Sequence, residues 1–310
     1  MGVCSDLRMI QRALFKVVSA CSHRNVLTEQ SPVSQGHIEA GAAVGIIAGN
    51  GPFPILFARE ARSHGHRVVA VCHLDETDPA IENEVDQVVW IRVGELGKLI
   101  AAFREASVGY VAMAGGINRV KHLRDVKLDA KGAALLLKIR STKDDVIMRG
   151  IASELEKLEI EVISSTHFLS NCLAREGVLT KSKPSENELE DIGVGILAIK
   201  AMSAQDIGQL VVVGGGVVVA VEAVEGTNQC ILRGGMLGGK GCVVVKCAKP
   251  TQDMRFDVPT VGIKTIETMI EAGARVLAIE AGRTLIIEEQ EFLKLANRHK
   301  IAVVGCAPLV

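Results

Sequence analysis

Short apolar runs alternate with helical patterns from Ala43 onward, and this alternation constrains the fold more than any other feature of the chain. The first run, residues 43–48, leads through a Gly-Asn-Gly turn into a helical pattern over residues 54–63. Further strands are predicted at residues 67–72, 87–92, 109–114 and 160–164, and further helices at residues 96–105, 131–139 and 145–158. Strands that alternate with helices in this way predict βαβ units, a parallel sheet and right-handed crossovers.

The core that this chain can build is aliphatic. Hydrophobic residues make up 48% of the 310 residues, whereas aromatic residues make up only 3%. With 31 glycines, this composition is typical of a Val- and Ile-rich parallel sheet covered by helices. The length is sufficient for two domains that each bury a core of their own.

The second half of the chain has a different pattern. Residues 177–190 are polar, which predicts a linker or exposed loop, and residues 210–221 contain two β-branched runs around three glycines, which predict a hairpin. Later strands are expected at residues 243–247, 275–279 and 301–304, and later helices at residues 264–271 and 288–298. We therefore expect an α/β protein with an N-terminal extension, disordered or partly helical, at residues 1–40, a Rossmann-like parallel-sheet domain at 41–167, and a mixed α/β domain at 168–310.

Charge and cysteine usage narrow the class of protein. The formal net charge is −1, which provides no electrostatic basis for binding nucleic acid. The eight cysteines form no Cys-x-x-Cys pair and are predicted to be reduced core thiols of a cytoplasmic protein. No run of about 18 uncharged apolar residues is present, so no membrane-spanning segment is expected. An amphipathic pattern at residues 10–18 is interrupted by charge, unlike a secretory signal.

Gly45, Gly49 and Gly51 surround the first predicted strand-to-helix turn. Backbone N–H groups in this context can bind a phosphate group. The turn is not a dinucleotide-binding fingerprint, because Pro54 stands where the third glycine would fall and the second strand ends in Cys72-His73 instead of an acid. Two interpretations remain open, an anion or nucleotide near this turn or a tight turn without a ligand.

Residues 249–259 combine two acids with two cations directly after an apolar strand-like run. Carboxylates such as Asp253 and Asp257 are natural ligands for Mg²⁺, which needs only one or two of them when substrate phosphate oxygens complete its coordination. Lys249 and Arg255 can hold phosphoryl oxygens, Arg255 in bidentate fashion. The spacing fits a solvated charged loop that leads into a helix equally well, and both interpretations remain open.

Other chemical motifs are weaker. Glu222 and residues 225–228 form a polar cluster that we interpret as a turn with a helix cap. The sequence contains no His-x-x-x-His pair, no Gly-x-Ser-x-Gly elbow and no Gly-x-x-x-x-Gly-Lys-Ser/Thr loop. Two function classes remain, an enzyme acting on a phosphate-containing substrate and a non-catalytic nucleotide- or sugar-phosphate-binding module. An NAD-dependent dehydrogenase is disfavoured by the glycine turn.

From about Gly45 to its C-terminus, the chain resembles the UDP-2,3-diacylglucosamine pyrophosphatases of the LpxI type, a family of bacterial lipid A synthesis. The matching segments are residues 45–54, 145–156, 206–209, 221–223, 225–227, 249–262 and 280–284. The segment 249–262, Lys-Pro-Thr-Gln-Asp-Met-Arg-Phe-Asp-Val-Pro-Thr-Val-Gly, is the most specific of these. Three positions depart from the family pattern: Asn50 replaces a glycine, Val120 a proline, and Asn228 an aspartate, which puts ligand or metal geometry at Asn228 in question.

The resemblance implies a hydrolase that cleaves the pyrophosphate of UDP-2,3-diacylglucosamine to 2,3-diacylglucosamine 1-phosphate and UMP, with Mg²⁺ as cofactor. It implies a catalytic C-terminal domain in which Asp253 is the essential acid and Asp257 ranks second, both as candidate metal ligands. The substrate-binding residues expected on the same basis are Gly49, Asn50, Gly51, Pro52, Gly115, Gly116, Gln209, Glu225, Gly226, Thr227, Lys249, Gln252 and Arg255.

The resemblance also implies the partners of the protein. We expect a homodimer in the cytoplasm, with no nucleic acid bound. Because the implied substrate carries two acyl chains, we expect peripheral contact with the inner face of the cytoplasmic membrane, to which the amphipathic segment at residues 10–18 could contribute.

Overall fold

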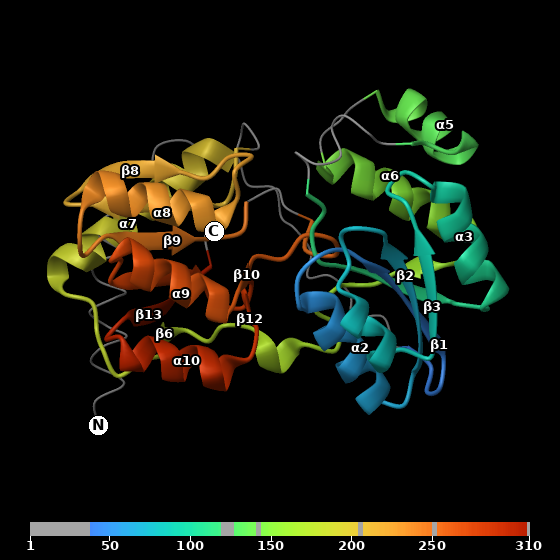
Figure 1. The fold of residues 1–310 in the computed structure, drawn as a ribbon, viewed down its shortest axis with the longest axis horizontal. Coiled ribbons are helices and arrows are strands. Elements are labelled where there is room, and N and C mark those ends of the chain that lie inside the picture. Colours follow the sequence, from blue (N-terminus) through green and yellow to red (C-terminus); the bar gives the residue numbers. More distant parts are fainter. Residues whose placement is uncertain (1–37, 119–126, 141–143, 204–206, 250–252, 309–310) are drawn as a thin grey trace. The chain divides into compact units, whose positions relative to one another are not determined.

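The structure is a computed structural model that describes residues 38–118, 127–140, 144–203, 207–249 and 253–308 (Figure 1). The chain divides into two compact units. The N-terminal unit contains the described residues up to 171 together with residues 253–258, and the C-terminal unit contains residues 172–249 and 259–308. The N-terminal extension predicted for residues 1–40 lies almost wholly outside the described residues.

The N-terminal unit is built around a five-stranded parallel sheet with the strand order β3-β2-β1-β4-β5. Its strands are β1 (Ala43–Ala48), β2 (Arg67–His73), β3 (Gln87–Ile91), β4 (Tyr110–Ala114) and β5 (Glu161–Val162). Its helices are α2 (Phe53–Ser63), α3 (Leu96–Glu105), α5 (Ala130–Ile139), α6 (Asp144–Glu156) and a 3-10 helix at Pro79–Glu84. The chain reverses its direction of travel across the sheet between β1 and β4, which is where open α/β sheets commonly bind ligands.

Helices cover both faces of this sheet (Figure 1). One face packs against α3 and α6, where Phe103 and Leu155 are fully buried beside Val111 of β4. Helix α2 contacts β1, β2 and β4 and buries Phe57. Continuous apolar strands of this kind follow from burial on both faces, and the predicted Rossmann-like parallel sheet is confirmed.

The C-terminal unit contains a six-stranded mixed sheet with the order β6-β13-β11-β9-β7-β8. Its strands are β6 (Gly177–Val178), β7 (Leu210–Gly214), β8 (Val217–Val221), β9 (Val243–Lys246), β11 (Val276–Glu280) and β13 (Ala302–Cys306). Two short parallel strands, β10 (Thr260–Val261) and β12 (Leu285–Ile286), pair separately. The predicted hairpin is confirmed, because β7 and β8 pair in antiparallel fashion. The second domain is therefore mixed α/β, as expected.

Alternate residues of these strands face opposite helical layers. The helices are α7 (Glu186–Ser203), α8 (Thr227–Gly238), α9 (Ile263–Ala272) and α10 (Glu289–Arg298). A 3-10 helix at Ser170–Cys172 contains the boundary between the two units. Val212 and Leu277 pack in a cluster with α8, α9 and α10, whereas Val211 and Val245 pack with α7. This period of two is what a sheet covered on both faces requires.

Two sequence predictions need correction. The polar segment at 177–190 is not a continuous linker, because its first two residues form β6 and α7 begins at Glu186. Both α7 and α8 were missed as helices. Helix α7 has apolar residues around much of its surface, so its sequence shows no clear helical period. Helix α8 contains several glycines, which destabilise helix interiors, and its sequence shows no clear helical period either.

The prediction of buried core thiols is confirmed for five cysteines, Cys72, Cys230, Cys242, Cys247 and Cys306. Burial raises the pKa of Cys72, with a smaller contribution from Glu82, to about 12. Burial also raises the pKa of Cys306, again with a smaller contribution from a neighbouring carboxylate, to about 12. Thiols held protonated in this way are unreactive.

Residues 253–258 pack with the N-terminal unit although they follow β9 of the C-terminal unit in the sequence (Figure 1). Phe256 is 3% exposed and belongs to the core cluster that includes Leu155 and Val111. The sequence analysis expected a division between residues 167 and 168 and placed residues 253–258 in the C-terminal domain. The segment with the most specific motif is therefore anchored in the unit formed mainly by the first half of the chain.

We predict that Phe256→Ala lowers the free energy of unfolding of the N-terminal unit by about 3 kcal/mol or more, because it removes a buried aromatic side chain and leaves a cavity. The fluorescence of Trp90, the single tryptophan of the chain and a residue of β3, reports this unfolding in urea. Leu137→Ala, at a side chain that is 76% exposed on α5, is the control and should change stability by less than about 0.5 kcal/mol. Equal stabilities of the two variants would contradict the packing of Phe256.

Candidate active site

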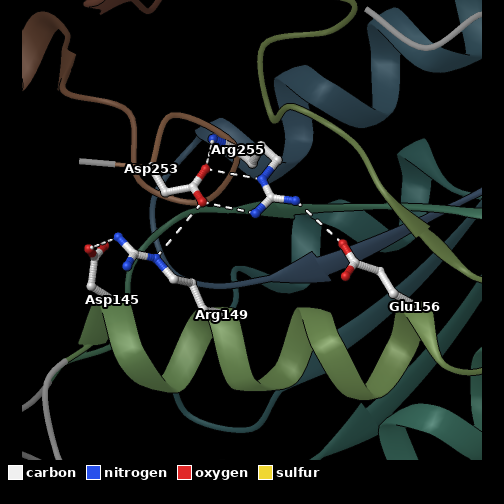
Figure 2. Close-up of polar contacts among 5 residues, drawn as sticks. All are labelled: Asp145, Arg149, Glu156, Asp253 and Arg255. Carbon is white, nitrogen blue, oxygen red and sulfur yellow. Dashed lines mark hydrogen bonds and ion pairs between the residues drawn. The ribbon is translucent and has the colours of Figure 1, made fainter. Parts of the chain in front are cut away.

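The carboxylate of Asp253 is held by Arg255 from the same loop (Figure 2). The guanidinium donates from Nε to Oδ1 over 3.1 Å and from Nη2 to Oδ2 over 2.9 Å. The backbone N–H of Arg255 donates to Oδ1 as well, over 3.1 Å. Oδ1 therefore accepts two hydrogen bonds and Oδ2 accepts one, so Oδ2 retains the greater capacity for a further partner. A paired fork of this kind fixes the orientation of the carboxylate.

Helix α6 lies alongside this pair and supplies three charged side chains from one face (Figure 2). Asp145, Arg149 and Glu156 recur at helical spacing, which places them in a row. Arg149 donates from Nη2 to Asp145 Oδ2 over 2.7 Å, and its Nε lies 4.0 Å from Oδ2 of Asp253. Glu156 accepts from Nη1 of Arg255 over 3.4 Å. Five charges thus alternate in sign, with Asp253 at the centre.

The loop that carries Asp253 is a tight turn. The backbone N–H groups of Phe256 and Asp257 both donate to the carbonyl oxygen of Asp253, over 3.1 and 3.3 Å. The N–H of Ser165, which lies just beyond β5, donates to the carbonyl oxygen of Arg255 over 3.3 Å. The guanidinium carbon of Arg255 lies 4.7 Å from the centre of the Phe256 ring, a cation–π contact. These contacts fix the backbone from Asp253 to Asp257.

The electrostatic environment keeps Asp253 ionised. Burial by itself raises the pKa of this carboxyl group, but the hydrogen bonds from Arg255 and the charges of Arg255 and Arg149 outweigh burial and hold the pKa below its ordinary value. The hydrogen bond with Asp253 is in turn the main cause of the raised pKa of Arg255. A carboxylate with a lowered pKa is a weak base and a good ligand for a cation or a hydrogen-bond donor.

The oxygen atoms around Asp253 fit Mg²⁺ only together with oxygens from a substrate. Within the described residues, no group of three or more His, Cys, Asp or Glu side chains is arranged to hold a metal ion. Mg²⁺ is commonly held by one or two carboxylates together with substrate phosphates, and Oδ2 of Asp253 can supply one such oxygen. The residues therefore fit Mg²⁺ bound jointly with a substrate. Asp257 lies in the same turn, and its share in metal binding stays a prediction.

The predicted glycine segments meet at the switch point of the parallel sheet. The N–H of Gly49 donates to Ala114 O and the N–H of Asn50 to Gly116 O, both over 2.7 Å. A Cβ atom at Gly49 would lie 2.3 Å from the carbonyl oxygen of Gly116, and one at Gly115 would lie 2.5 Å from that of Asn50. Close approach of the two loops thus explains both glycines without any ligand. The interpretation as a tight turn without a ligand therefore accounts for Gly49 and Gly115.

Asn50, which replaces a glycine of the family pattern, has a structural partner. Its Nδ2 donates to Oε2 of Glu76 over 2.9 Å, and the same oxygen accepts from the backbone N–H of Asn118 over 3.0 Å. The loops that follow β1, β2 and β4 are therefore tied together at the carboxyl edge of the sheet. Gly51 and Pro52 continue from this point into α2.

A second group of predicted residues lies in the C-terminal unit, around Glu222 at the end of β8. Its Oε2 accepts from the backbone N–H of Gln209 over 3.2 Å, and its Oε1 accepts from Oγ1 of Thr227 over 2.8 Å. Nζ of Lys246, a side chain that is only 5% exposed, donates to Oγ1 of Thr227 over 3.1 Å. Gly226 is the N-cap of α8, a helix that was not predicted from the sequence.

The structure thus brings the predicted residues together in three places. Gly49 and Asn50 meet Gly115 and Gly116, Asp253 meets Arg255, and Gln209 meets Thr227 through Glu222. Gly51 and Pro52 follow Asn50 at the start of α2. Glu225 is bound by the guanidinium of Arg233. Lys249 belongs to the C-terminal unit, and Gln252 lies outside the described residues.

Sequence reasoning missed Arg149 and Lys246 as site residues. The signal for Arg149 was available, because Asp145, Arg149 and Glu156 share one helical face within a segment that matches the family. The signal for Lys246 was a cation at the end of a run of three valines in β9. A lysine in that position must be paired inside the protein, since burying an unpaired charge is costly.

Comparison with known proteins places the chain in a family. The model of the LpxI N-terminal domain matches residues 43–172, and the model of the LpxI C-terminal domain matches residues 175–304. The chain belongs to the LpxI family. It is 31% identical over 277 residues to the UDP-2,3-diacylglucosamine pyrophosphatase LpxI of Caulobacter vibrioides, a match that covers 86% of this chain and 98% of that protein.

Two solved structures that match this LpxI-family chain are distantly similar to it. The biotin carboxylase domain of 2-oxoglutarate carboxylase from Hydrogenobacter thermophilus matches with a TM-score of 0.23 and 12% identity, over 61% of this chain and 39% of that one. N5-carboxyaminoimidazole synthetase from Staphylococcus aureus matches with a TM-score of 0.24 and 12% identity, over 67% of this chain and 47% of that one. Scores this low support no conclusion about the site.

We predict that Arg255→Lys raises the pKa of Asp253, because a lysine cannot reproduce the two parallel hydrogen bonds. Carboxyl ¹³C chemical shifts during a pH titration measure this change. Arg62→Lys, which alters an ion pair with Asp86 elsewhere in the unit, is the control and should leave the Asp253 titration unchanged. An unaltered Asp253 pKa in Arg255→Lys would mean that the fork does not set it.

The same contacts predict a pH dependence of stability. Because the folded-state pKa of Asp253 is lowered, its contribution is complete above the unfolded-state pKa of about 3.9 and is lost as pH falls through the folded-state value. The stability gap between the wild type and Asp253→Asn should therefore narrow below about pH 4. Urea midpoints between pH 3 and pH 7, followed by Trp90 fluorescence, test this. A gap that is constant over that range would contradict it.

Ser165 carries a buried hydroxyl group for which the described residues offer no hydrogen-bond partner. Removing an unsatisfied buried hydroxyl avoids its desolvation cost of about 1–3 kcal/mol. We therefore expect Ser165→Ala to leave the free energy of unfolding unchanged or to increase it, as measured in urea. Ser164→Ala is the contrast, since Oγ of Ser164 bonds to Thr166 and its loss should destabilise the unit. A clear loss of stability in Ser165→Ala would show that its hydroxyl has a partner.

Proposed function

We propose that this protein hydrolyses the pyrophosphate bond of UDP-2,3-diacylglucosamine to 2,3-diacylglucosamine 1-phosphate and UMP, a step of lipid A biosynthesis. The observation that carries this proposal is the match of the chain to both LpxI domain models. A relative named as a pyrophosphatase, which aligns over 98% of its own length, supports it further. The ionised carboxylate of Asp253, held between two arginines within the most specific matching segment, is consistent with that chemistry.

Asp253 is proposed to act as a fixed negative charge that orients a cation or the attacking water. The hydrogen bonds from Arg255 lower its pKa and make it a weaker base, whereas an efficient general base has a pKa near the working pH. Its oriented Oδ2 suits a role as ligand. Catalysis would then consist mainly of positioning and of neutralising phosphate charge, which are the largest contributions in phosphoryl transfer.

Mg²⁺ is the proposed cofactor. Asp253 would hold it, with Asp257 as the second candidate ligand, and the ion would offset the charge of the pyrophosphate and lower the pKa of a bound water. The chain's own contribution is to keep Asp253 ionised and oriented through Arg255, which it does by the contacts described above.

The remaining partner predictions follow from the substrate. A substrate with two acyl chains implies work at the inner face of the cytoplasmic membrane, and none of the described helices is long and apolar enough to cross a membrane. We therefore propose peripheral contact. A homodimer is proposed on the family resemblance alone.

The alternative is a non-catalytic module that binds a nucleotide or sugar phosphate. The loops at Gly49 and Gly115 would serve such a module, but their contacts with one another already explain those glycines. An ionised, oriented acid such as Asp253 beside the arginines suits hydrolysis of a phosphoanhydride, whereas binding a phosphate needs only the cations. The hydrolase is therefore the better-supported function.

The decisive experiment incubates the purified protein with UDP-2,3-diacylglucosamine and detects UMP by mass spectrometry. We expect turnover in the wild type and a decrease of about a hundredfold to a thousandfold in Asp253→Asn, because one oriented charge is removed from the reacting centre. Glu105→Gln, at an exposed acid on α3, is the matched control and should keep wild-type turnover. Binding of the substrate without any UMP would favour the non-catalytic module.

Chelation provides a separate test of the cofactor. EDTA should abolish UMP release and added Mg²⁺ should restore it, because the pyrophosphate charge would otherwise remain without its neutralising ion. The folded state serves as the control, since Trp90 fluorescence should be the same in EDTA and in Mg²⁺. Full turnover in the presence of the chelator would rule out the metal.

A further inference from the structure

The two arginines beside Asp253 differ in how much of their hydrogen-bonding capacity is in use (Figure 2). Arg255 donates from Nε and Nη2 to Asp253 and from Nη1 to Glu156, so all three of its nitrogens have partners. Its side chain is 32% exposed, and its ring contact with Phe256 restrains it further. A guanidinium fixed in this way cannot turn toward a ligand without releasing the Asp253 carboxylate.

Arg149 has capacity left. Its Nη2 is bound to Asp145, its Nε faces Oδ2 of Asp253 from 4.0 Å, beyond hydrogen-bond distance, and its Nη1 has no partner among the described residues. The side chain is 51% exposed. The guanidinium is thus held at one end by Asp145 while its other donors remain accessible beside the central carboxylate.

A cation in this position would lower the repulsion between Asp253 and a pyrophosphate, in addition to the proposed Mg²⁺. Arg255 is already paired with the Asp253 carboxylate and contributes little more to a ligand. A guanidinium with unused N–H groups can offset this repulsion and can hold a phosphoryl oxygen through a charge-assisted hydrogen bond. Arg149 is the guanidinium of the pair that meets this need.

We propose that Arg149 binds the phosphoryl oxygens of the substrate next to Asp253, and that Arg255 is a positioning residue that orients the Asp253 carboxylate. The identity of the substrate in this assignment rests on the proposed function. The assignment moves the anion-binding role, predicted from the sequence for Arg255, to Arg149. Asp145 is a positioning residue for Arg149, because its carboxylate fixes Nη2 and leaves the opposite edge of the guanidinium facing Asp253. Glu156 has the equivalent role for Arg255.

The first test measures binding without turnover, with inorganic pyrophosphate as the probe in isothermal titration calorimetry. Arg149→Gln should weaken pyrophosphate binding by about tenfold to a hundredfold, the effect of losing one charged hydrogen bond, and Arg149→Lys should restore part of it. Arg62→Gln, a surface arginine on α2 of the same unit, is the matched control and should bind as the wild type does. Unchanged binding in Arg149→Gln would overturn the proposal.

The second test separates the two arginines by kinetics with UDP-2,3-diacylglucosamine. Arg149→Gln should raise KM and change kcat little. Arg255→Lys should lower kcat and change KM little, since it loosens the fork that orients the Asp253 carboxylate. A fall in kcat without a rise in KM in Arg149→Gln would assign Arg149 a positioning role and overturn the proposal.

Failure of the proposed function would appear differently. If no variant releases UMP, the proposed substrate is wrong, but the calorimetric comparison still decides whether Arg149 binds a pyrophosphate. Trp90 fluorescence in urea confirms that each variant is folded before it is assayed. Should Arg149→Gln fail to fold, Arg149→Lys is the second variant, because it keeps the charge and the helix propensity. A direct contact would be contradicted if Arg149→Lys had wild-type pyrophosphate affinity and wild-type KM while Asp145→Asn had a weaker affinity and a raised KM.

Discussion

The paired hydrogen bonds between Arg255 and Asp253 are the interaction on which the candidate site depends. They hold a partly buried carboxylate in one orientation and keep it ionised, and both effects require the loop to stay in place. The loop stays in place because Phe256 is buried in the core of the N-terminal unit. A hydrophobic anchor three residues from the acid thus supports a polar arrangement that would be too weak to order itself at the surface.

The chemistry-bearing residues of both units gather at the ends of strands. In the N-terminal unit the loops after β1 and β4 meet at the switch point of the sheet, and in the C-terminal unit Glu222 and Lys246 lie at the ends of β8 and β9. Strand ends combine a rigid backbone with side chains that can leave the core. The buried charges of Glu222 and Lys246 are hydrogen-bonded, both of them to Thr227, as the cost of burying an unsatisfied charge requires.

Much of the fold could be predicted because its strands are uniformly apolar and its helices between residues 53 and 156 are amphipathic. Helix α3 was predicted to the residue, and β1, β2 and β4 to within one residue. Helices α7 and α8 were missed, since a helix buried on several sides has no polar face and glycines within a helix lower its propensity. The site was half predicted. Asp253 and Arg255 stood out in one short motif, but their partner Arg149 lies about a hundred positions earlier in the chain, and no local pattern joins them.

The sequence by itself determined the α/β class, the parallel sheet and the family, because these follow from local periodicity and from contiguous motifs. It also determined which loop carries the acids. Only the tertiary structure decided which unit that loop belongs to and which cations surround Asp253. The physical reason is that the burial of Phe256 and the ion pairs with α6 join segments that are distant along the chain, and such contacts depend on the folded core and not on neighbouring residues.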